Sequence, residues 1–192
     1  MNLPNKLTVG RIAMVPLVVL IYLVIPQDFC VISATNGLAL RDVLAFLIFM
    51  LASLTDMFDG QIARKYHLIT SFGKFFDPIA DKMLVNTMLI LLVYTHQANI
   101  VAVLLMIARD LIVDGLRMLA SQHGKVVSAG IYGKAKTVLQ MFAILFLLLK
   151  NWPFVYLGLP LDQILLWLAC LMSLFSGLIY FAQLKDFVLE SM

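Results

Sequence analysis

Four aspartates are the residues of this chain whose type and spacing could best do chemistry. Asp56 and Asp59 are three residues apart, and Asp77 and Asp81 are four apart. On a helix either spacing places both carboxylates of a pair on one face. Four carboxylates held together would repel one another, and divalent cations would relieve that repulsion. The set therefore predicts a site for hard cations, Mg²⁺ or Mn²⁺, and a pair of such ions could clamp a diphosphate.

The residues around these aspartates also suit a phosphate-bearing ligand. Gly60 and Gly73 leave room for a bulky group to approach the backbone, and Arg64 can donate two hydrogen bonds to one phosphate. The alternative is that the aspartates are ordinary charges at helix ends, with Asp77 as an N-cap before Pro78. That alternative does not explain why so many acids lie at the edge of apolar segments, where charges are costly.

A second group of charged residues lies within an apolar stretch and consists of Arg109, Asp110, Asp114 and Arg117. The two arginines are eight residues apart, which places them about 80° apart around a helix. Two guanidinium groups on one flank would bind a phosphate well. The alternative is internal ion pairing, for example of Asp110 or Asp114 with Arg117 or Arg41. Arg41 itself lies near the predicted outer end of its helix, far from the aspartates, and we expect a structural role for it.

A third group, Lys134, Lys136 and Thr137, precedes another apolar stretch. Lys134 or Lys136 could reach an anionic headgroup, and Thr137 could donate a hydrogen bond from a helix start. The alternative is that both lysines only flank a membrane segment on its cytoplasmic side. For Lys134 the two interpretations carry equal weight, and for Lys136 we prefer the flanking role.

The composition indicates what kind of element must position these groups. Of the 192 residues 62% are hydrophobic and 13% charged, with a mean hydropathy of +0.99. A soluble domain of this size would have roughly 25% charged residues, so the surroundings must be largely lipid. We predict an all-α polytopic membrane protein, a single domain over residues 1–192, with a short amphipathic N-terminal lead-in. Its six transmembrane helices are predicted at Ile12–Ile25, Leu38–Asp56, Ile79–Tyr94, Ile100–Ala120, Val138–Leu149 and Leu161–Phe181, the first and fifth extending into their polar flanks.

The distribution of Lys and Arg predicts the orientation of these helices. Basic residues gather at the N-terminus, in the second and fourth connections and near the C-terminus, whereas the other connections have almost none. This bias predicts that both termini and the aspartates are cytoplasmic. The second and third helices, joined by a short connection, are expected to be antiparallel neighbours, which would bring the four carboxylates together at one depth.

The aspartates and their neighbours form one extended motif, Asp56-x2-Asp59-Gly60-x2-Ala63-Arg64-x8-Gly73-x3-Asp77-x3-Asp81. This motif resembles the signature of the CDP-alcohol phosphotransferase family at every fixed position. The resemblance implies a six-helix membrane enzyme in which an alcohol attacks the β-phosphate of a CDP-linked lipid and CMP leaves.

By the same resemblance, Asp56, Asp59 and Asp77 would be metal ligands, and Asp81 would lie near the metal and act as general base. Gly60, Ala63, Arg64 and Gly73 would line the nucleotide and the diphosphate. The sequence does not separate the base from the ligands among the aspartates. The family often forms homodimers, which the sequence neither supports nor opposes.

The opening residues and the basic groups resemble the phosphatidylglycerophosphate-forming branch of the family. Asn5 and Thr8 would then help to form the nucleotide or acceptor end of the site, and Arg109, Arg117 and Lys134 would bind the acceptor. This resemblance implies CDP-diacylglycerol as donor and sn-glycerol 3-phosphate as acceptor, at a bacterial plasma membrane if the source is a bacterium. Sister branches use inositol phosphate, serine or phosphatidylglycerol with the same core, so these acceptors stay open.

Two further classes of protein compete with the enzyme. A cation carrier or channel would place acids at several depths along a pathway, and here they gather at one end. A structural membrane subunit would pair its charges with partner helices, which does not explain the fixed spacing. No pattern indicates nucleic-acid binding.

Overall fold

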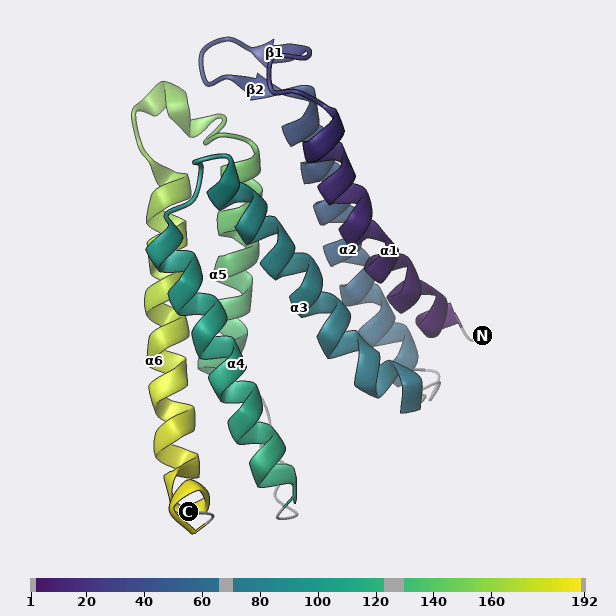
Figure 1. Ribbon diagram of the computed structural model, residues 1–192, viewed down its shortest axis with the longest axis vertical. Helices are drawn as coiled ribbons and strands as arrows, with labels where there is room; N and C mark the ends of the chain where they lie inside the picture. Colours follow the sequence, from purple (N-terminus) through teal and green to yellow (C-terminus); the bar gives the residue numbers. More distant parts are fainter. Residues whose placement is uncertain (1–2, 66–70, 123–129, 191–192) are drawn as a thin grey trace.

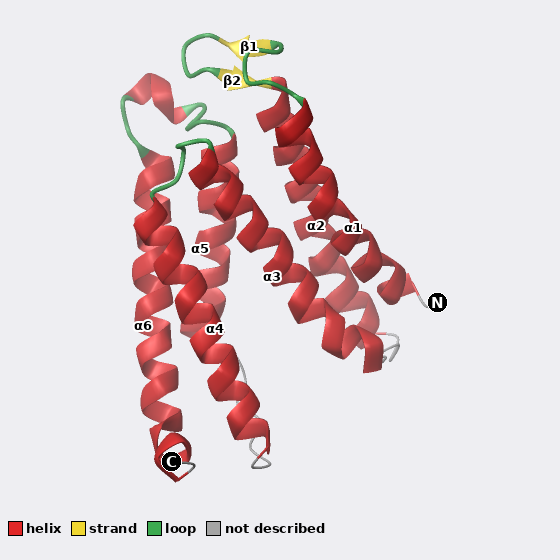
Figure 2. Ribbon diagram, viewed as in Figure 1, coloured by secondary structure: helices red, strands yellow, loops and turns green. Residues whose placement is uncertain are grey.

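The computed structural model of the protein describes residues 3–65, 71–122 and 130–190, with side chains left undescribed at 3–4, 56–65, 71–75, 122 and 186–190. This part of the chain is almost entirely helical (Figure 2). Its α-helices are α1 (Leu3–Val24), α2 (Leu40–Lys65), α3 (Ser71–Tyr94), α4 (Ile100–Gln122), α5 (Ile131–Leu148) and α6 (Leu161–Glu190). Two short strands, β1 (Val31–Ser33) and β2 (Leu38–Ala39), pair antiparallel between α1 and α2, and a 3₁₀ turn, η1 (Phe154–Leu157), precedes α6.

The helices form two groups of three that run up and down (Figure 1). In one group α1 packs against α2 and α3, and in the other α6 packs against α4 and α5. Contacts of α3 with α4 and α5, and of α2 with α5, join the groups. We call the end that carries β1, β2 and η1 the hairpin end, and the opposite end, where the chain begins and finishes, the termini end.

The six predicted helices are all present, but most begin earlier or end later than their apolar runs. Charged and polar residues continue each helix at the termini end, so that α2 reaches Lys65 and α6 reaches Glu190. The predicted N-terminal lead-in is wrong as a separate element, because α1 is continuous from Leu3. Pro4 lies in its first turn, where a helix tolerates proline. The strands and η1 were not predicted.

The second and third helices run antiparallel as expected, with their joined ends at the termini end (Figure 1). Along their described lengths, however, each has its extensive contacts with α1 rather than with the other. Over these lengths α1 therefore lies alongside both helices, and the expectation that their joined ends bring the four carboxylates together stays a prediction, since the side chains at 56–65 and 71–75 lie outside the described residues. This matters for the site, because residues of α1 are brought beside those of α3.

The outside of the helix bundle is apolar, as expected for a protein in lipid. Leu20 and Leu23 of α1 and Leu171 and Leu178 of α6 are more than half exposed. Three helices in the described chain are long and apolar enough to cross a membrane: Asn5–Val24, Ile131–Leu148 and Leu161–Lys185. Inside, fully buried small residues such as Ala45 allow the helices to approach closely. The chain is an integral membrane protein.

Candidate active site

The helices place the described aspartates of the motif at the termini end. Asp77 and Asp81 lie one turn apart on α3. Since α3 begins at Ser71, Asp77 is inside the helix, which excludes the N-cap interpretation. The Thr8 hydroxyl of α1 donates a 2.5 Å hydrogen bond to Asp77 Oδ1, which places Thr8 beside the motif. Asp56 and Asp59 lie on the last turns of α2, and their side chains are outside the described residues.

The described residues agree with a divalent-metal site without completing one. Asp77 and Asp81 supply carboxylate oxygens, the donors that Mg²⁺ and Mn²⁺ prefer, and the Thr8 hydroxyl can orient Asp77 in the way that outer partners orient metal ligands. Within the described side chains no group of three or more His, Cys, Asp or Glu could hold a metal ion. A complete set would therefore also need Asp56 and Asp59.

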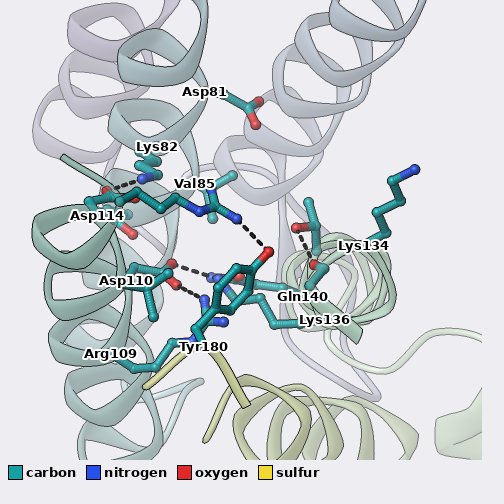
Figure 3. Close-up of a pocket in the computed structure, with 15 residues that line it drawn as sticks. Asp81, Lys82, Val85, Arg109, Asp110, Asp114, Lys134, Lys136, Gln140 and Tyr180 are labelled. Carbon is teal, nitrogen blue, oxygen red and sulfur yellow. Dashed lines mark hydrogen bonds and ion pairs between the residues drawn. The ribbon is translucent and has the colours of Figure 1, made fainter. Parts of the chain in front are cut away.

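A cavity of about 180 Å³ extends from Asp81 into the space between α3, α4, α5 and α6 (Figure 3). Five cationic side chains and three carboxylates line it, together with polar groups. The lining consists of Asp81, Lys82, Val85, Asn86, Arg109, Asp110, Val113, Asp114, Arg117, Gly133, Lys134, Lys136, Thr137, Gln140 and Tyr180. The excess of positive charge favours an anionic ligand beside Asp81.

Asp110 is the centre of an ion network on one wall of this cavity. Arg109 Nη1 donates to Asp110 Oδ1 at 2.8 Å, and Lys136 Nζ donates to Asp110 Oδ2 at 2.6 Å. Arg109 Nη2 also donates to Ser176 Oγ of α6 at 2.8 Å. One carboxylate thus holds two cations from two helices in place, as Figure 3 shows.

Arg117 is held differently, because it has an aromatic partner and no carboxylate partner among the described residues. Its Nη2 donates to the Tyr180 hydroxyl at 2.7 Å, and its guanidinium lies 4.7 Å from the centre of the tyrosine ring. Asp114 pairs instead with Lys82. The charge of Arg117 is therefore not neutralised by a paired acid within the described chain, and it can act on a ligand.

Three residues of the lining keep buried hydrogen-bond donors without an acceptor among the described atoms. These donors are Arg109 Nε, Arg117 Nε and Gln140 Nε2. Buried N–H groups without a partner are rare in native proteins and call for an explanation. A ligand with several acceptor oxygens, such as a phosphate, could accept from them.

The pairing predicted as the alternative for these charges is wrong in its details. Asp110 and Asp114 do pair internally, but with Arg109, Lys136 and Lys82 rather than with Arg117 or Arg41. The flanking role preferred for Lys136 is also wrong, since its residue is only 6% exposed. Lys134 is exposed and lines the cavity, whereas Thr137 donates to the Gly133 carbonyl of its own helix.

The comparisons with known proteins agree with the sequence motif and with this geometry. A family model described as CDP-alcohol phosphatidyltransferase matches residues 1–175. A Bacillus subtilis protein named CDP-diacylglycerol–glycerol-3-phosphate 3-phosphatidyltransferase is 40% identical over 95% of this chain and 94% of its own. Two further proteins have the same name. The one from Rickettsia typhi is 40% identical over 97% of this chain and 98% of its own. The one from Wigglesworthia glossinidia brevipalpis is 35% identical over 94% of this chain and 93% of its own.

The chain belongs to the CDP-alcohol phosphatidyltransferase family. The resemblance predicted from the motif is therefore confirmed. Of the residues to which the motif assigned roles in this family, Gly60, Ala63, Arg64 and Gly73 lie on α2 and α3, but their side chains are outside the described residues. Asn5 lies on α1 within one turn of Thr8. The roles of these residues stay predictions.

Several residues around the cavity of this CDP-alcohol phosphatidyltransferase were missed by sequence reasoning, namely Lys82, Asn86, Gln140, Ser176 and Tyr180. For Gln140 and Ser176 a signal was present, because uncharged polar residues inside long apolar helices usually bond to other helices. For Lys82 and Tyr180 no pattern in the sequence indicated the partner.

Beside the polar cavity, α2 and α5 form an apolar groove of about 720 Å³. Leu54, Val138 and Phe142 in its lining are each more than two-fifths exposed. Lys134 and Thr137 line both the groove and the polar cavity. A molecule with an anionic head and an apolar tail could therefore occupy both at once.

Proposed function

We propose that this enzyme transfers the phosphatidyl group of CDP-diacylglycerol to sn-glycerol 3-phosphate, giving phosphatidylglycerophosphate and CMP. The observation that carries the choice of acceptor is the cavity beside Asp81, with its excess of cationic side chains and the buried donors of Arg117 and Gln140. The names of the similar proteins from three bacteria support the same acceptor. A phosphate-free acceptor such as serine offers these donors only a carboxylate, which has less charge and fewer acceptor oxygens than a phosphate.

In the reaction, the C1 hydroxyl of glycerol 3-phosphate attacks the phosphorus that is bonded to diacylglycerol. The new P–O bond forms as the bond to the CMP oxygen breaks, and CMP leaves with the bonding electrons. The hydroxyl proton must pass to a base within hydrogen-bond reach. Asp81, on the cavity wall, is the carboxylate proposed to take this proton.

The residues of the cavity hold the acceptor so that its hydroxyl faces Asp81. Arg109, Arg117 and Lys134 are proposed to bind its phosphate, helped by Lys136 and Gln140. Asp110 keeps Arg109 and Lys136 in position rather than contacting the ligand itself. Holding the two reactants in a fixed geometry removes a large entropic part of the barrier.

Asp56, Asp59, Asp77 and Asp81 would hold the divalent ions, a pair of Mg²⁺ or Mn²⁺ ions by the motif. Bound there, the metal would supply positive charge that stabilises the diphosphate as the P–O bond breaks. Arg64, Gly60, Ala63 and Gly73 are proposed to line the diphosphate and the nucleotide, with Asn5 and Thr8 at the same end of the site.

The apolar groove between α2 and α5 is proposed as the place where the donor lipid meets the site. The acyl chains of this lipid must stay in the bilayer while its headgroup reaches the aspartates. The exposure of Leu54 and Phe142 supports lateral access from lipid, and Lys134 at the junction could meet the phosphate as it arrives.

For the orientation, we propose that all six helices cross the membrane and that the termini end is cytoplasmic, as the distribution of Lys and Arg predicts. Cys30 provides a native probe, because it is exposed at the hairpin end, whereas Cys170 is buried. A membrane-impermeant maleimide should label Cys30 in intact cells, with Cys30→Ser as the control. Labelling of Cys30 only after the cells are opened would contradict this orientation.

An acceptor panel tests the proposed activity. Purified protein in mixed micelles with CDP-diacylglycerol and Mg²⁺ should release CMP with glycerol 3-phosphate, and EDTA should abolish release. CMP release with serine, inositol phosphate or phosphatidylglycerol but not with glycerol 3-phosphate would overturn the acceptor and keep the chemistry. Absence of CMP with every acceptor, together with cation flux in vesicles, would favour the carrier.

A further inference from the structure

Both arginines of the cavity, Arg109 and Arg117, contact Tyr180 of α6. The residue is 3% exposed, and its ring centre lies 4.7 Å from the Arg117 guanidinium and 5.9 Å from that of Arg109. Its hydroxyl accepts hydrogen bonds from Arg117 Nη2 at 2.7 Å and from the Gly130 backbone N–H at 2.8 Å. One side chain of α6 thus contacts both guanidinium groups of α4 and the start of α5.

Two more residues of the same helix fit the shape of Arg109. Ser176 Oγ accepts a hydrogen bond from Arg109 Nη2 at 2.8 Å. At Gly177, a Cβ atom would lie 2.9 Å from Arg109 Cγ, closer than real Cβ contacts allow, and 3.2 Å from its Nε, which is tighter than most such contacts. The stem of Arg109 therefore crosses α6 at the one residue without a side chain, and its head reaches Ser176 one position earlier.

The α6 residues of these contacts lie beyond the part of the chain that the family model matches. The match ends at residue 175, and Ser176, Gly177 and Tyr180 follow it on α6. The aspartate motif, by contrast, lies well within the match. The proposed chemistry and the residues that hold the two arginines thus belong to different parts of the chain.

We propose that Ser176, Gly177 and Tyr180 form an arginine seat that fixes Arg109 and Arg117 for the phosphate of the acceptor, with Tyr180 as the main positioning residue. The proposal rests on the proposed function, since it names what selects the acceptor at that site. Arginine side chains are long and flexible, and holding them before the ligand arrives removes an ordering cost from binding. The seat also occupies Arg117 Nη2, and Arg117 Nε has no acceptor among the described residues.

The proposed seat and simple helix packing would affect different kinetic constants. Packing of α6 against α4 would affect the whole enzyme, whereas the seat affects acceptor binding alone. Tyr180→Phe keeps the ring and removes only the hydroxyl, and Gly177→Ala displaces only Arg109. Ser176→Ala removes one hydrogen bond, and Ser173→Ala is its matched control, since Ser173 is buried on the same helix and its hydroxyl has no partner in the described chain.

The experiment measures the KM for glycerol 3-phosphate and for CDP-diacylglycerol, the kcat, and inhibition by inorganic phosphate, for each purified variant. Tyr180→Phe should raise the KM for glycerol 3-phosphate and the inhibition constant of phosphate together, by about tenfold, the cost of one hydrogen bond to a charged group. Ser176→Ala should raise both about threefold, and Gly177→Ala should raise both by a similar factor. The KM for CDP-diacylglycerol and the kcat should stay within about twofold of wild type in all, and Ser173→Ala should match wild type.

Equal changes in both KM values, or a lower unfolding temperature with unchanged KM values, would overturn the seat and leave the proposed function standing. If the wild type uses another phosphate-bearing acceptor, the proposed function fails, and a tenfold change of that acceptor's KM in Tyr180→Phe would still support the seat. Use of a phosphate-free acceptor alone would overturn both.

Discussion

Two regions of the molecule each contain an aspartate with the same kinds of neighbour, fully buried in one region and half-buried in the other. Asp42 at the hairpin end follows Arg41, contacts Lys150 just after α5 and accepts a hydrogen bond from Tyr22. Asp110 in the cavity follows Arg109 and contacts Lys136 of α5, and Tyr180 lies beside its arginine. Composition alone does not distinguish the two groups.

What differs is how many cations around each aspartate lack an acid, since in both regions an arginine Nε is buried without a hydrogen-bond acceptor among the described residues. The Asp42 residue is fully buried, its Oδ2 accepts from the Ala39 N–H at 3.2 Å, and Arg41 donates to Gln27 at 3.0 Å. Lys150 also donates to the Gly37 carbonyl, which fastens the loop after β1 to the end of α5. These contacts hold the hairpin end together, in agreement with the structural role expected for Arg41.

Around Asp110 the balance is different, because the cavity adds charge that the protein does not pair. Arg117 has an aromatic partner in place of an acid, and Arg117 Nε and Gln140 Nε2 have no acceptor in the described part of the chain. The comparison teaches that a buried Arg–Asp pair becomes a binding site when further cations and an open volume surround it. The predictions below change one end of the molecule and use the other as control.

The largest expected effect is at Asp81. Asp81→Asn should lower kcat by about a thousandfold or more, because the proposed base is lost, while binding of the CDP-lipid stays largely intact. Asp162→Asn, at the hairpin end, should have normal turnover. Equilibrium binding of labelled CDP-diacylglycerol measures the second effect. If Asp81→Asn loses this binding as completely as Asp56→Asn does, Asp81 is chiefly a metal ligand.

The next effect concerns stability at the hairpin end. Asp42→Asn leaves Lys150 and Arg41 without their acid in a fully buried place, and breaking such pairs costs about 3–5 kcal/mol. Thermal unfolding in detergent should therefore show a clearly lower midpoint for Asp42→Asn than for Asp110→Asn, whose carboxylate borders the open cavity. Equal midpoints would remove the distinction between a structural end and a binding end.

Arginine substitutions should separate the two ends in kinetics. Arg109→Ala should raise the KM for glycerol 3-phosphate about thirtyfold, as expected when a charged hydrogen-bond donor is lost, and should change the KM for CDP-diacylglycerol much less. Arg41→Ala should leave both KM values near wild type and lower the unfolding midpoint instead. An unchanged acceptor KM in Arg109→Ala would exclude this residue from the site.

The smallest expected effect is at Lys134, which is exposed and whose ammonium group has no hydrogen-bond or ion-pair partner among the described residues. Lys134→Ala should raise the KM for glycerol 3-phosphate about threefold to fivefold, and less at high salt, because exposed charges are screened. Steady-state rates at two salt concentrations measure this. A rise as large as for Arg109→Ala would show that Lys134 is a main anchor of the phosphate.

Much of the fold could be predicted because lipid imposes a simple rule on helices. Apolar runs of nearly membrane length gave the number and order of the helices, and all of them are present. Their ends could not be predicted in this way, since charged residues such as Lys65 and Lys136 continue the helices beyond the apolar runs. The short strands depend on contacts such as those of Asn36 with the Leu149 and Lys150 carbonyls, which are remote in sequence.

The site likewise has a part that the sequence predicts and a part that it does not. The aspartates could be predicted because their spacing is local and fixed along two helices. The cavity could not, because Arg109 depends on Ser176 and Gly177, and Arg117 depends on Tyr180, more than sixty residues away. Lys136 has the sequence position of a flanking charge, and only the fold places Asp110 opposite it.

The most direct test of the account is transfer of label from glycerol 3-phosphate into lipid. Purified protein reconstituted with CDP-diacylglycerol and Mg²⁺ should move the label into the chloroform-soluble fraction, with one CMP formed for each molecule transferred. Asp81→Asn should do neither. CMP release without label in the lipid, or label transfer that Asp81→Asn leaves unchanged, would contradict the account.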